Sequence, residues 1–353
     1  MELEPYLKLL ALKQGSDLFL SAGALPHVKV NGTLSPVGKR PLAAGELLEL
    51  AHSFMDAEQK RDYERTWECT VAIGLEGVGR FRINVFRQRS TPALVIRYIQ
   101  DRIPSLAELN LPPVLGDLIH KKRGLILVVG AAGTGKSTTL AAMIEHRNSR
   151  QPGHILTIED PIEFIHHHKV SLVNQREVGF DTRSYAAGLK NAMREAPDVI
   201  LIGEIRDAET MQEAIAYAET GHLCLSTLHA NNANQTLDRI LSFFPEARHP
   251  QVRLDLSLNL QAVVSQRLIA TLDGGYIPAV EVMLLSRYLS ELILLGEVRK
   301  IKDAMEESKL DGMQTFDQAL YQLYQTGRIG LEEALANADS RNDLSLRIRL
   351  EDE

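Results

Sequence analysis

The strongest constraint on the fold of this chain is the segment 130–137, GAAGTGKS, together with its flanks. It fits the pattern G-x-x-x-x-G-K-[ST], in which the backbone N–H groups of a glycine-rich loop cradle phosphate groups. The unbroken apolar run 125–129 precedes it, as a parallel strand buried on both faces requires. Residues 137–144 follow as a predicted helix whose N-terminus would face an anion. The sequence therefore predicts a strand, a phosphate-binding loop and a helix in direct succession.

The residue types in this loop suit ATP with Mg²⁺. Lys136 would reach the β and γ phosphates, and the Ser137 hydroxyl would hold Mg²⁺. The residues expected to bind the nucleotide are Gly130, Gly133, Thr134, Gly135, Lys136, Ser137 and Thr138. A glycine-rich turn that binds nothing is the alternative, and the strand and helix on either side disfavour it.

Length and composition narrow the class of protein. A chain of 353 residues suggests two domains, and a net charge of −7 argues against DNA or RNA as the main ligand. Cys69 and Cys224 are too few for a Cys₄ zinc site and fit a reducing compartment. Apolar runs stay well below the ~18 residues of a membrane span, and the first residues do not resemble a signal peptide. We therefore expect a cytoplasmic protein without a membrane span.

The periodicity of the chain changes near residues 99–114, where three prolines indicate a linker. Residues 1–98 mix helical and alternating patterns, which is typical of a small α+β domain. Asn31 and Gly32 form a strong hairpin-turn signal. The expected helices span 4–13 and 44–66, and the expected strands include 17–20, 27–30, 79–86 and 93–99.

Residues 115–353 are predicted to form the second domain. Strands at 154–158, 198–202 and 222–227 follow the loop strand, with helical stretches between them. This alternation predicts an α/β fold, a doubly wound ATPase core, with a mainly helical region from about residue 285.

Carboxylates follow two of these predicted strands. Glu204 comes after the apolar run 199–202 and could contact Mg²⁺, as the acid of a Walker B strand does. Glu159, Asp160 and Glu163 follow residues 154–158, and one of them could position the attacking water. The residues alone leave Glu159 and Glu163 open for that task, and a capped helix start is the alternative for the group.

Histidines stand on both sides of the predicted strand 222–227. For His229 we favour a strand-end residue that senses the γ-phosphate, with a hydrogen-bonded core histidine as the alternative for both His222 and His229. A metal pair is poorly supported, because no second ligand pair completes it. The run His166–His168 is expected to lie in a surface loop.

Arginines cluster in the first domain, and two interpretations are open. They could solvate an exposed face, or some could reach a nucleotide bound by a neighbouring subunit and stabilise transition-state charge. The cluster comprises Arg80, Arg82, Arg87, Arg89 and Arg97.

Taken together, these segments resemble the secretion ATPase superfamily, and within it the type IV pilus retraction ATPases of the PilT/PilU family. Residues 155–164, ILTIEDPIEF, match the Asp box of that family, and 198–207, DVILIGEIRD, match its Walker B motif. Residues 221–229, GHLCLSTLH, match its His box. Residues 16–18 and 29–32 match its PAS-like N-terminal domain, and 172–177 and 312–317 add further similarity.

The resemblance implies a RecA-like P-loop ATPase core with a PAS-like N-terminal domain and a helical C-terminal region. It further implies a homo-hexameric ring that hydrolyses ATP with Mg²⁺ and drives pilus retraction, or twitching motility. Such a ring would lie peripherally at the cytoplasmic face of the inner membrane and contact a pilus platform protein there. The residues assigned by motif position are Glu163 as catalytic base, Glu204 as Mg²⁺ acid, His222 and His229 of the His box, and Arg82, Arg97 and Arg239 near the nucleotide.

Two departures favour the accessory, PilU-type members, which act with a PilT-type paralogue. The segment 291–296 corresponds to part of the AIRNLIRE motif of PilT-type chains, but Leu294 and Leu295 replace its Arg-Glu pair. The C-terminal segment from residue 337 is also more like the accessory type. The alternatives are a non-hydrolysing accessory ring, a nucleic-acid motor, and a pilus assembly or type II secretion ATPase, whose tetracysteine zinc module this sequence lacks.

Overall fold

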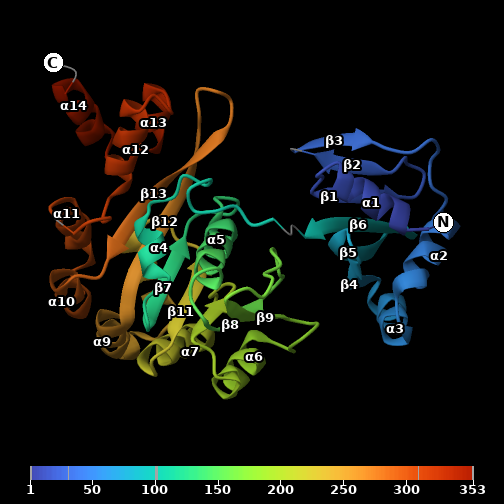
Figure 1. The fold of residues 1–353 in the computed structure, drawn as a ribbon, viewed down its shortest axis with the longest axis horizontal. Coiled ribbons are helices and arrows are strands. Elements are labelled where there is room, and N and C mark those ends of the chain that lie inside the picture. The colour runs from blue at the N-terminus through green and yellow to red at the C-terminus, as the bar shows by residue number, and fades with distance from the viewer. Residues whose placement is uncertain (1, 31, 100–101, 309, 352–353) are drawn as a thin grey trace. The chain divides into compact units, whose positions relative to one another are not determined.

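The structure, a computed structural model, describes residues 2–30, 32–99, 102–308 and 310–351. The chain divides into two compact units, residues 1–102 with 163–165, and 103–162 with 166–353. Each unit is described by itself, and Figure 1 labels its elements.

The first unit is a six-stranded antiparallel sheet with helices, in the order β3-β2-β1-β6-β5-β4. Alternate residues of the long strands enter its core, as Phe81, Ile83 and Val85 do, because side chains alternate across a strand. Its elements are α1 (Glu4–Leu12), β1 (Asp17–Ser21), β2 (His27–Val30), β3 (Thr33–Pro36), α2 (Ala44–Phe54), α3 (Ala57–Thr66), β4 (Glu68–Leu75), β5 (Gly79–Gln88) and β6 (Thr91–Ile99).

The predicted strands and the first helix of this unit are confirmed, but the predicted single helix over 44–66 is wrong. Met55 is extended, and Asp56 caps a new helix by accepting hydrogen bonds from the N–H groups of Glu58 and Gln59, both at 2.8 Å. An N-terminal capping aspartate ends one helix and starts the next. Of the predicted hairpin turn between β2 and β3, Asn31 lies outside the described residues, whereas the antiparallel pairing of the two strands is present.

The second unit is built on a seven-stranded sheet in the order β13-β12-β7-β11-β10-β8-β9, in which only β13 runs antiparallel to its neighbour. Its strands are β7 (Gly124–Val129), β8 (Gly153–Glu159), β9 (Ser171–Glu177), β10 (Val199–Ile202), β11 (Leu223–Leu228), β12 (Leu260–Ala270) and β13 (Tyr276–Leu284). Its helices are α4 (Val114–Leu118), α5 (Lys136–Asn148), α6 (Tyr185–Ala192), α7 (Ala208–Glu219), α8 (Ala233–Ser242), α9 (His249–Asn259), α10 (Arg287–Leu295), α11 (Ile301–Glu306), α12 (Phe316–Gln325), α13 (Leu331–Asn337) and α14 (Arg341–Glu351).

Helices cover both faces of this sheet, and every residue of β7, β10 and β11 is buried. One core gathers residues of α6 to α10 with side chains such as Leu127 and Ile202, and the other gathers residues of α4 and α5 with side chains such as Val128. Uninterrupted apolar strands suit this position, since neither face meets water. The predicted strands, the doubly wound core and the helical region beyond residue 285 are therefore confirmed, while β9, β12 and β13 were not predicted.

The prediction of a surface loop for the three histidines is wrong for the first of them. His166 is only 7 % exposed, and its backbone N–H group donates a hydrogen bond to Gln175 Oε1 at 2.8 Å. Burial lowers the pKa of His166 to about 4, so the imidazole is neutral. His167 and His168 are exposed, as expected.

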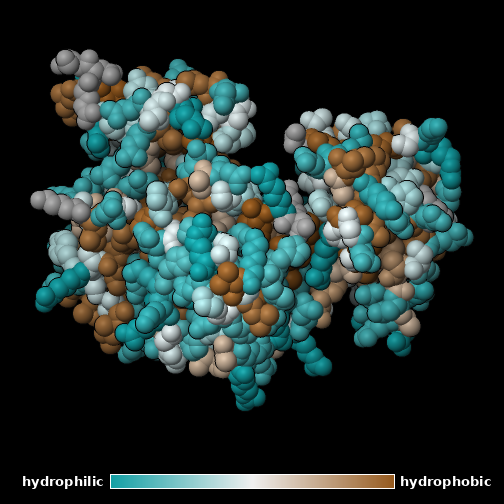
Figure 2. All heavy atoms as spheres, viewed as in Figure 1, coloured by the Kyte–Doolittle hydropathy of each residue, from teal (hydrophilic) through white to brown (hydrophobic). Residues whose placement is uncertain are grey.

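The surface of the protein is mainly polar, with apolar atoms gathered in places, among them α14 at the C-terminal end (Figure 2). Leu346 and Leu350 are the exposed leucines of that helix. Across the part of the chain that the structure describes, no helix combines the length and apolar character needed to cross a bilayer.

Candidate active site

The phosphate-binding loop joins the end of β7 to the start of α5. At Gly130 the backbone has φ 152°, and a Cβ atom there would lie 2.6 Å from the carbonyl oxygen of Gln266 on β12. Gly135, with φ 88°, is the left-handed residue from which α5 begins. Glycine is required at both points, because the backbone passes too close to a neighbour at one and turns left-handed at the other.

Lys136 is the first residue of α5, and its side chain folds back over the loop. Its Nζ donates hydrogen bonds to the carbonyl oxygens of Gly130, at 3.0 Å, and Ala131, at 2.8 Å. Thr134 Oγ1 donates to the same Ala131 oxygen at 2.9 Å. An ammonium group has three donors and no acceptor, so this placement holds a positive charge within the loop where phosphate oxygens would compete for it.

The Walker B acid predicted at Glu204 lies directly after Gly203, the residue that follows β10, and has two polar neighbours. Its Oε2 accepts a hydrogen bond from Arg206 Nη2 at 2.6 Å, and its Oε1 lies 3.0 Å from His229 Nε2. His229 follows β11, the strand that pairs in parallel with β10, so the register brings the two side chains together. The sequence predicted Glu204 and His229 separately, but gave no sign of the contact with Arg206.

The acids of the Asp box differ in how many partners they have. Glu159 Oε1 accepts hydrogen bonds from Thr157 Oγ1, at 2.6 Å, and Gln175 Nε2, at 3.2 Å. Glu163 is exposed and makes no hydrogen bond or ion pair with any residue that the structure describes. A general base needs a carboxylate oxygen that is not already engaged, and Glu163 meets that condition better than Glu159.

Tyr185, which the sequence did not single out, is the first residue of α6 and stands beside Glu159. Its hydroxyl oxygen lies 2.8 Å from the point where a Cβ on Gly203 would be, and Glu159 Cα lies 3.2 Å from the same point. Burial, and then the charges of Asp160 and Glu159, raise the pKa of Tyr185 above its usual range, so the phenol stays protonated. A tyrosine at a helix start has no distinguishing pattern, which is why sequence reasoning missed it.

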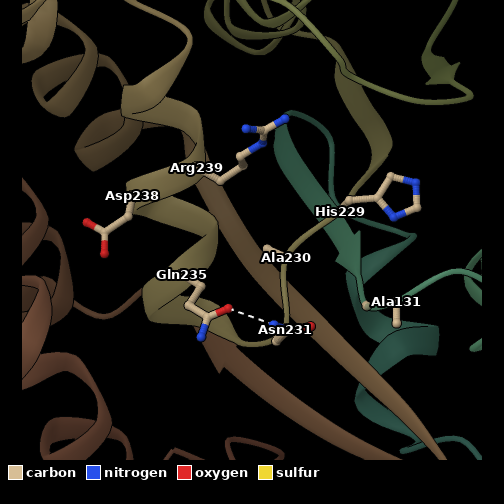
Figure 3. Close-up of a pocket in the computed structure, with 8 residues that line it drawn as sticks. Ala131, His229, Ala230, Asn231, Gln235, Asp238 and Arg239 are labelled. Carbon is tan, nitrogen blue, oxygen red and sulfur yellow. Dashed lines mark hydrogen bonds between the residues drawn. The ribbon is translucent and has the colours of Figure 1, made fainter.

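A cavity of about 350 Å³ opens beside the phosphate-binding loop (Figure 3). The loop supplies one wall and α8 the other, and the segment after β11 lies between them (Figure 3). Asn231 Nδ2 donates to Gln235 Oε1 at 3.0 Å across the start of α8. The lining residues are Gly130, Ala131, His229, Ala230, Asn231, Gln235, Asp238 and Arg239. The structure thus brings Arg239 to the same cavity as the loop and His229.

His222, which the sequence analysis assigned to the nucleotide, lies apart from this group within the chain. It precedes β11, and its carbonyl oxygen accepts a hydrogen bond from the N–H of Gly124 at the start of β7, at 3.0 Å. The loop and His229 follow the opposite ends of the same two strands. The length of β11 therefore separates the two histidines, and a metal pair between them is excluded.

Arg82 and Arg97 lie directly opposite each other on β5 and β6 of the first unit. Arg97 Nε donates a hydrogen bond to Asp17 Oδ1 at 2.9 Å, and Asp17 is buried. The Asp17 carboxylate thus pairs with Arg97, and Arg82 adds a second guanidinium group on the neighbouring strand, so positive charge outnumbers negative charge at these three positions. Like charges in directly opposed positions are unfavourable unless an anion binds there.

The residues present fit a nucleoside triphosphate with Mg²⁺. Lys136 and the N–H groups at the start of α5 suit phosphate oxygens, while the Ser137 hydroxyl and the Glu204 carboxylate are hard oxygen ligands of the kind Mg²⁺ prefers. Ser137 and Thr138 lie in the first turn of α5 and are partly exposed, so both are open to a ligand. Among the described residues, no group of three or more His, Cys, Asp or Glu side chains could hold a metal by itself.

Comparison with known proteins agrees with this geometry. The family model for type II/IV secretion system proteins matches residues 27–344. The type IV pilus ATPase PilU of Pseudomonas aeruginosa is 54 % identical over 99 % of this chain and 92 % of its own length. The type IV pilus retraction ATPase PilT of the same organism is 42 % identical over 92 % of this chain and 95 % of its own length.

A solved structure shows the same fold. The crystal structure of the pilus retraction motor PilT with bound ADP superimposes with a TM-score of 0.91 at 40 % identity, covering 98 % of this chain and 99 % of that one. The chain therefore belongs to the type II/IV secretion system protein family, and within it to the PilT/PilU group of type IV pilus ATPases.

The position of Lys136 leads to a first prediction. Lys136→Ala should weaken ADP binding by about 10- to 100-fold, because hydrogen bonds to a charged group contribute about 1.5–3 kcal/mol. Fluorescence titration with a labelled ADP measures the dissociation constant. Lys122→Ala, at an exposed lysine just before β7, is the matched control. Equal affinity of Lys136→Ala and the control would contradict the assignment of the loop.

Proposed function

We propose that this chain is an ATP-hydrolysing motor of type IV pilus retraction that works as a homo-hexamer. The observation that carries the proposal is the single sheet edge at which the phosphate-binding loop, Glu204 and His229 meet, in a fold shared with an ADP-bound retraction motor. A ring that only binds the nucleotide is less consistent with an acid, a base candidate and a phosphate-binding lysine that are all present.

Each side chain has a task that its surroundings support. The loop N–H groups and Lys136 bind and orient the phosphates, and Glu163 accepts a hydrogen bond from the attacking water and takes its proton. His229 contacts one oxygen of Glu204 and so fixes the orientation of that carboxylate. Mg²⁺, held by Ser137 and Glu204, neutralises phosphate charge when bound. Arg239 approaches the phosphates from α8, on the other wall of the cavity.

The arginine pair of the first unit supports a site shared between subunits. Arg97 pairs with the buried Asp17 carboxylate and Arg82 lies directly opposite Arg97, so an anionic ligand is favoured beside the two arginines. In a ring, the nucleotide of a neighbouring subunit supplies such an anion, and guanidinium groups match phosphate oxygens in a bidentate way. We infer that both arginines act in trans.

The surface of α10 supports dependence on a partner. Leu294 and Leu295, which replace the charged pair of PilT-type chains, are 44 % and 60 % exposed. We propose that the ring acts as the accessory, PilU-type ATPase beside a PilT-type paralogue, at the cytoplasmic face of the inner membrane where a platform protein receives it. Comparing ATP turnover of this chain alone and with the paralogue tests that dependence.

The role of Glu163 can be tested directly. Glu163→Gln should keep ATP affinity and lower Mg²⁺-dependent turnover by about 10²-fold or more, the usual effect of losing a general base. Phosphate release measures turnover, and Glu332→Gln, at an exposed helix position, is the control. Normal turnover in Glu163→Gln would move the role of base to Glu159.

Mixed rings test whether the arginines act across the interface. Arg97→Ala and Glu163→Gln should each have low turnover alone, and a mixture of the two should regain activity. In such a mixture, some sites combine an intact Glu163 with an Arg97 from the neighbour. A mixture of Lys136→Ala and Glu163→Gln is the control, because both changes affect the same subunit's site. Turnover in the first mixture no higher than in this control would show that Arg97 acts within its own subunit.

A further inference from the structure

Glu281, in the middle of β13, is a buried carboxylate that lies outside all the motifs of the nucleotide site. It is 3 % exposed. Its Oε1 accepts two hydrogen bonds, from the N–H of Ala233 at 2.7 Å and from Ser265 Oγ at 3.0 Å. A buried carboxylate is costly unless it is well hydrogen-bonded, so its position needs an explanation.

The first of these contacts fixes the start of α8. Ala233 is the first residue of that helix, where backbone N–H groups have no partner within the helix and the dipole favours a negative charge. Asn232 caps the same end by accepting a hydrogen bond from the N–H of Gln235 at 2.9 Å. Gln235 and Arg239, further along α8, line the cavity beside the phosphate-binding loop. Glu281 therefore holds one wall of that cavity.

The second contact leads to the loop itself. Ser265 on β12 lies directly opposite Glu281 on β13 and pairs on its other side with Val129, the last residue of β7 before the loop. The next residue of β12, Gln266, places its carbonyl oxygen against Gly130 and donates a hydrogen bond from Nε2 to Thr139 Oγ1 on α5, at 2.9 Å. Through Ser265, the Glu281 carboxylate is thus linked to the base of the phosphate-binding loop, which is the other wall of the cavity.

We propose that Glu281 is a positioning residue of the nucleotide site: its ionised carboxylate holds the start of α8 at a fixed distance from the phosphate-binding loop and thereby strengthens nucleotide binding. The inference rests on the proposed function of the cavity as a nucleotide site. It assigns to β13 a part in binding that none of the nucleotide motifs contains.

Glu281 changes between its protonated and ionised forms near neutral pH. Burial raises the pKa of Glu281 to about 7, while the hydrogen bonds from Ala233 and Ser265 oppose that rise. Of the charged groups that act on it, Asp339 raises the pKa and Arg267 lowers it. The pKa in the folded chain thus lies above the ordinary value of 4.5, so ionisation of Glu281 lowers folding stability as pH rises from about 4.5 to 7.

The direction of this change in folding stability distinguishes a positioning role of Glu281 from a purely structural role. Glu281→Gln keeps the shape of the side chain and copies its neutral form. At pH 8 it should therefore unfold at the same or a higher temperature than the wild type, because the buried charge is gone. If the ionised carboxylate positions α8, the same variant should bind nucleotide more weakly. Calorimetry and a binding titration on one preparation measure both quantities.

The test is the dissociation constant of a fluorescent ADP for the full chain between pH 5.5 and 8.5. At pH 8.5 we expect Glu281→Gln to bind about 10-fold more weakly than the wild type, the usual contribution of a hydrogen bond to a charged group. At pH 5.5 the two proteins should bind equally, because the wild-type carboxyl is then protonated. Dividing the dissociation constant of Glu281→Gln by that of the wild type at each pH removes the effect of the nucleotide's own protonation. Glu332→Gln is the control. A ratio that does not change with pH would overturn the proposal.

Ser265→Ala provides an independent variant that keeps the carboxylate. It removes one donor to the ionised form, so the midpoint of the pH dependence of binding should move to higher pH. An unchanged midpoint would show that Glu281 is not the titrating group and would also overturn the proposal. Absence of nucleotide binding by the wild type at every pH would instead contradict the proposed function.

Discussion

Four parallel strands, β7, β11, β10 and β8, end at one edge of the second unit, and the candidate catalytic groups follow those ends. The register pairs Val129 with Leu228 and Ile202 with both Ser226 and Ile158. The loop, His229, Glu204 and Glu159 thus leave the sheet side by side, although nearly one hundred residues can separate them in the sequence. A slip of register at any pair would move an acid or a histidine away from the phosphates.

The burial of the central strands on both faces explains which strands the sequence could predict and which it could not. Apolar runs marked β7, β10 and β11 because strands buried on both faces contain few polar residues. Strands β12 and β13 carry buried polar residues, among them Ser265, Gln266 and Glu281, so they lacked that signal. His222 was assigned to the nucleotide because the family's His box contains both histidines, yet the two ends of one strand reach opposite edges of a sheet. Arg206 and Tyr185 depend on contacts between separate segments, which no local pattern contains.

Some charged side chains in this unit form groups of three or more, beside the simple ion pairs such as Arg176 with Glu195. Glu204 contacts both Arg206 and His229. Further along the chain, Lys302 Nζ lies 2.9 Å from Asp317 Oδ2. The Asp317 carboxylate also accepts hydrogen bonds from the backbone N–H groups of Asp339 and Ser340. Arg206 and His229 are largely exposed, whereas Lys302 and Asp317 are mostly buried. Loss of one member should therefore cost more in the second group, where the remaining polar atoms stay away from water.

Strand β12 joins these groups to the phosphate-binding loop. Arg267 Nη2 donates to Asp339 Oδ1 at 2.6 Å, and Arg267 Nη1 donates to the carbonyl oxygen of Asn337 at 2.6 Å, which anchors the connection between α13 and α14. Two residues earlier on the same strand, Ser265 pairs with Val129 at the base of the loop. Strand β12 pairs with β13 from Ala262 to Ala270 and with β7 as far as Ser265, so Arg267 lies two residues beyond the part that is paired on both sides. A mechanical load on the C-terminal helices would therefore reach the phosphate-binding loop through Arg267 and Ser265, which are only two residues apart on one strand.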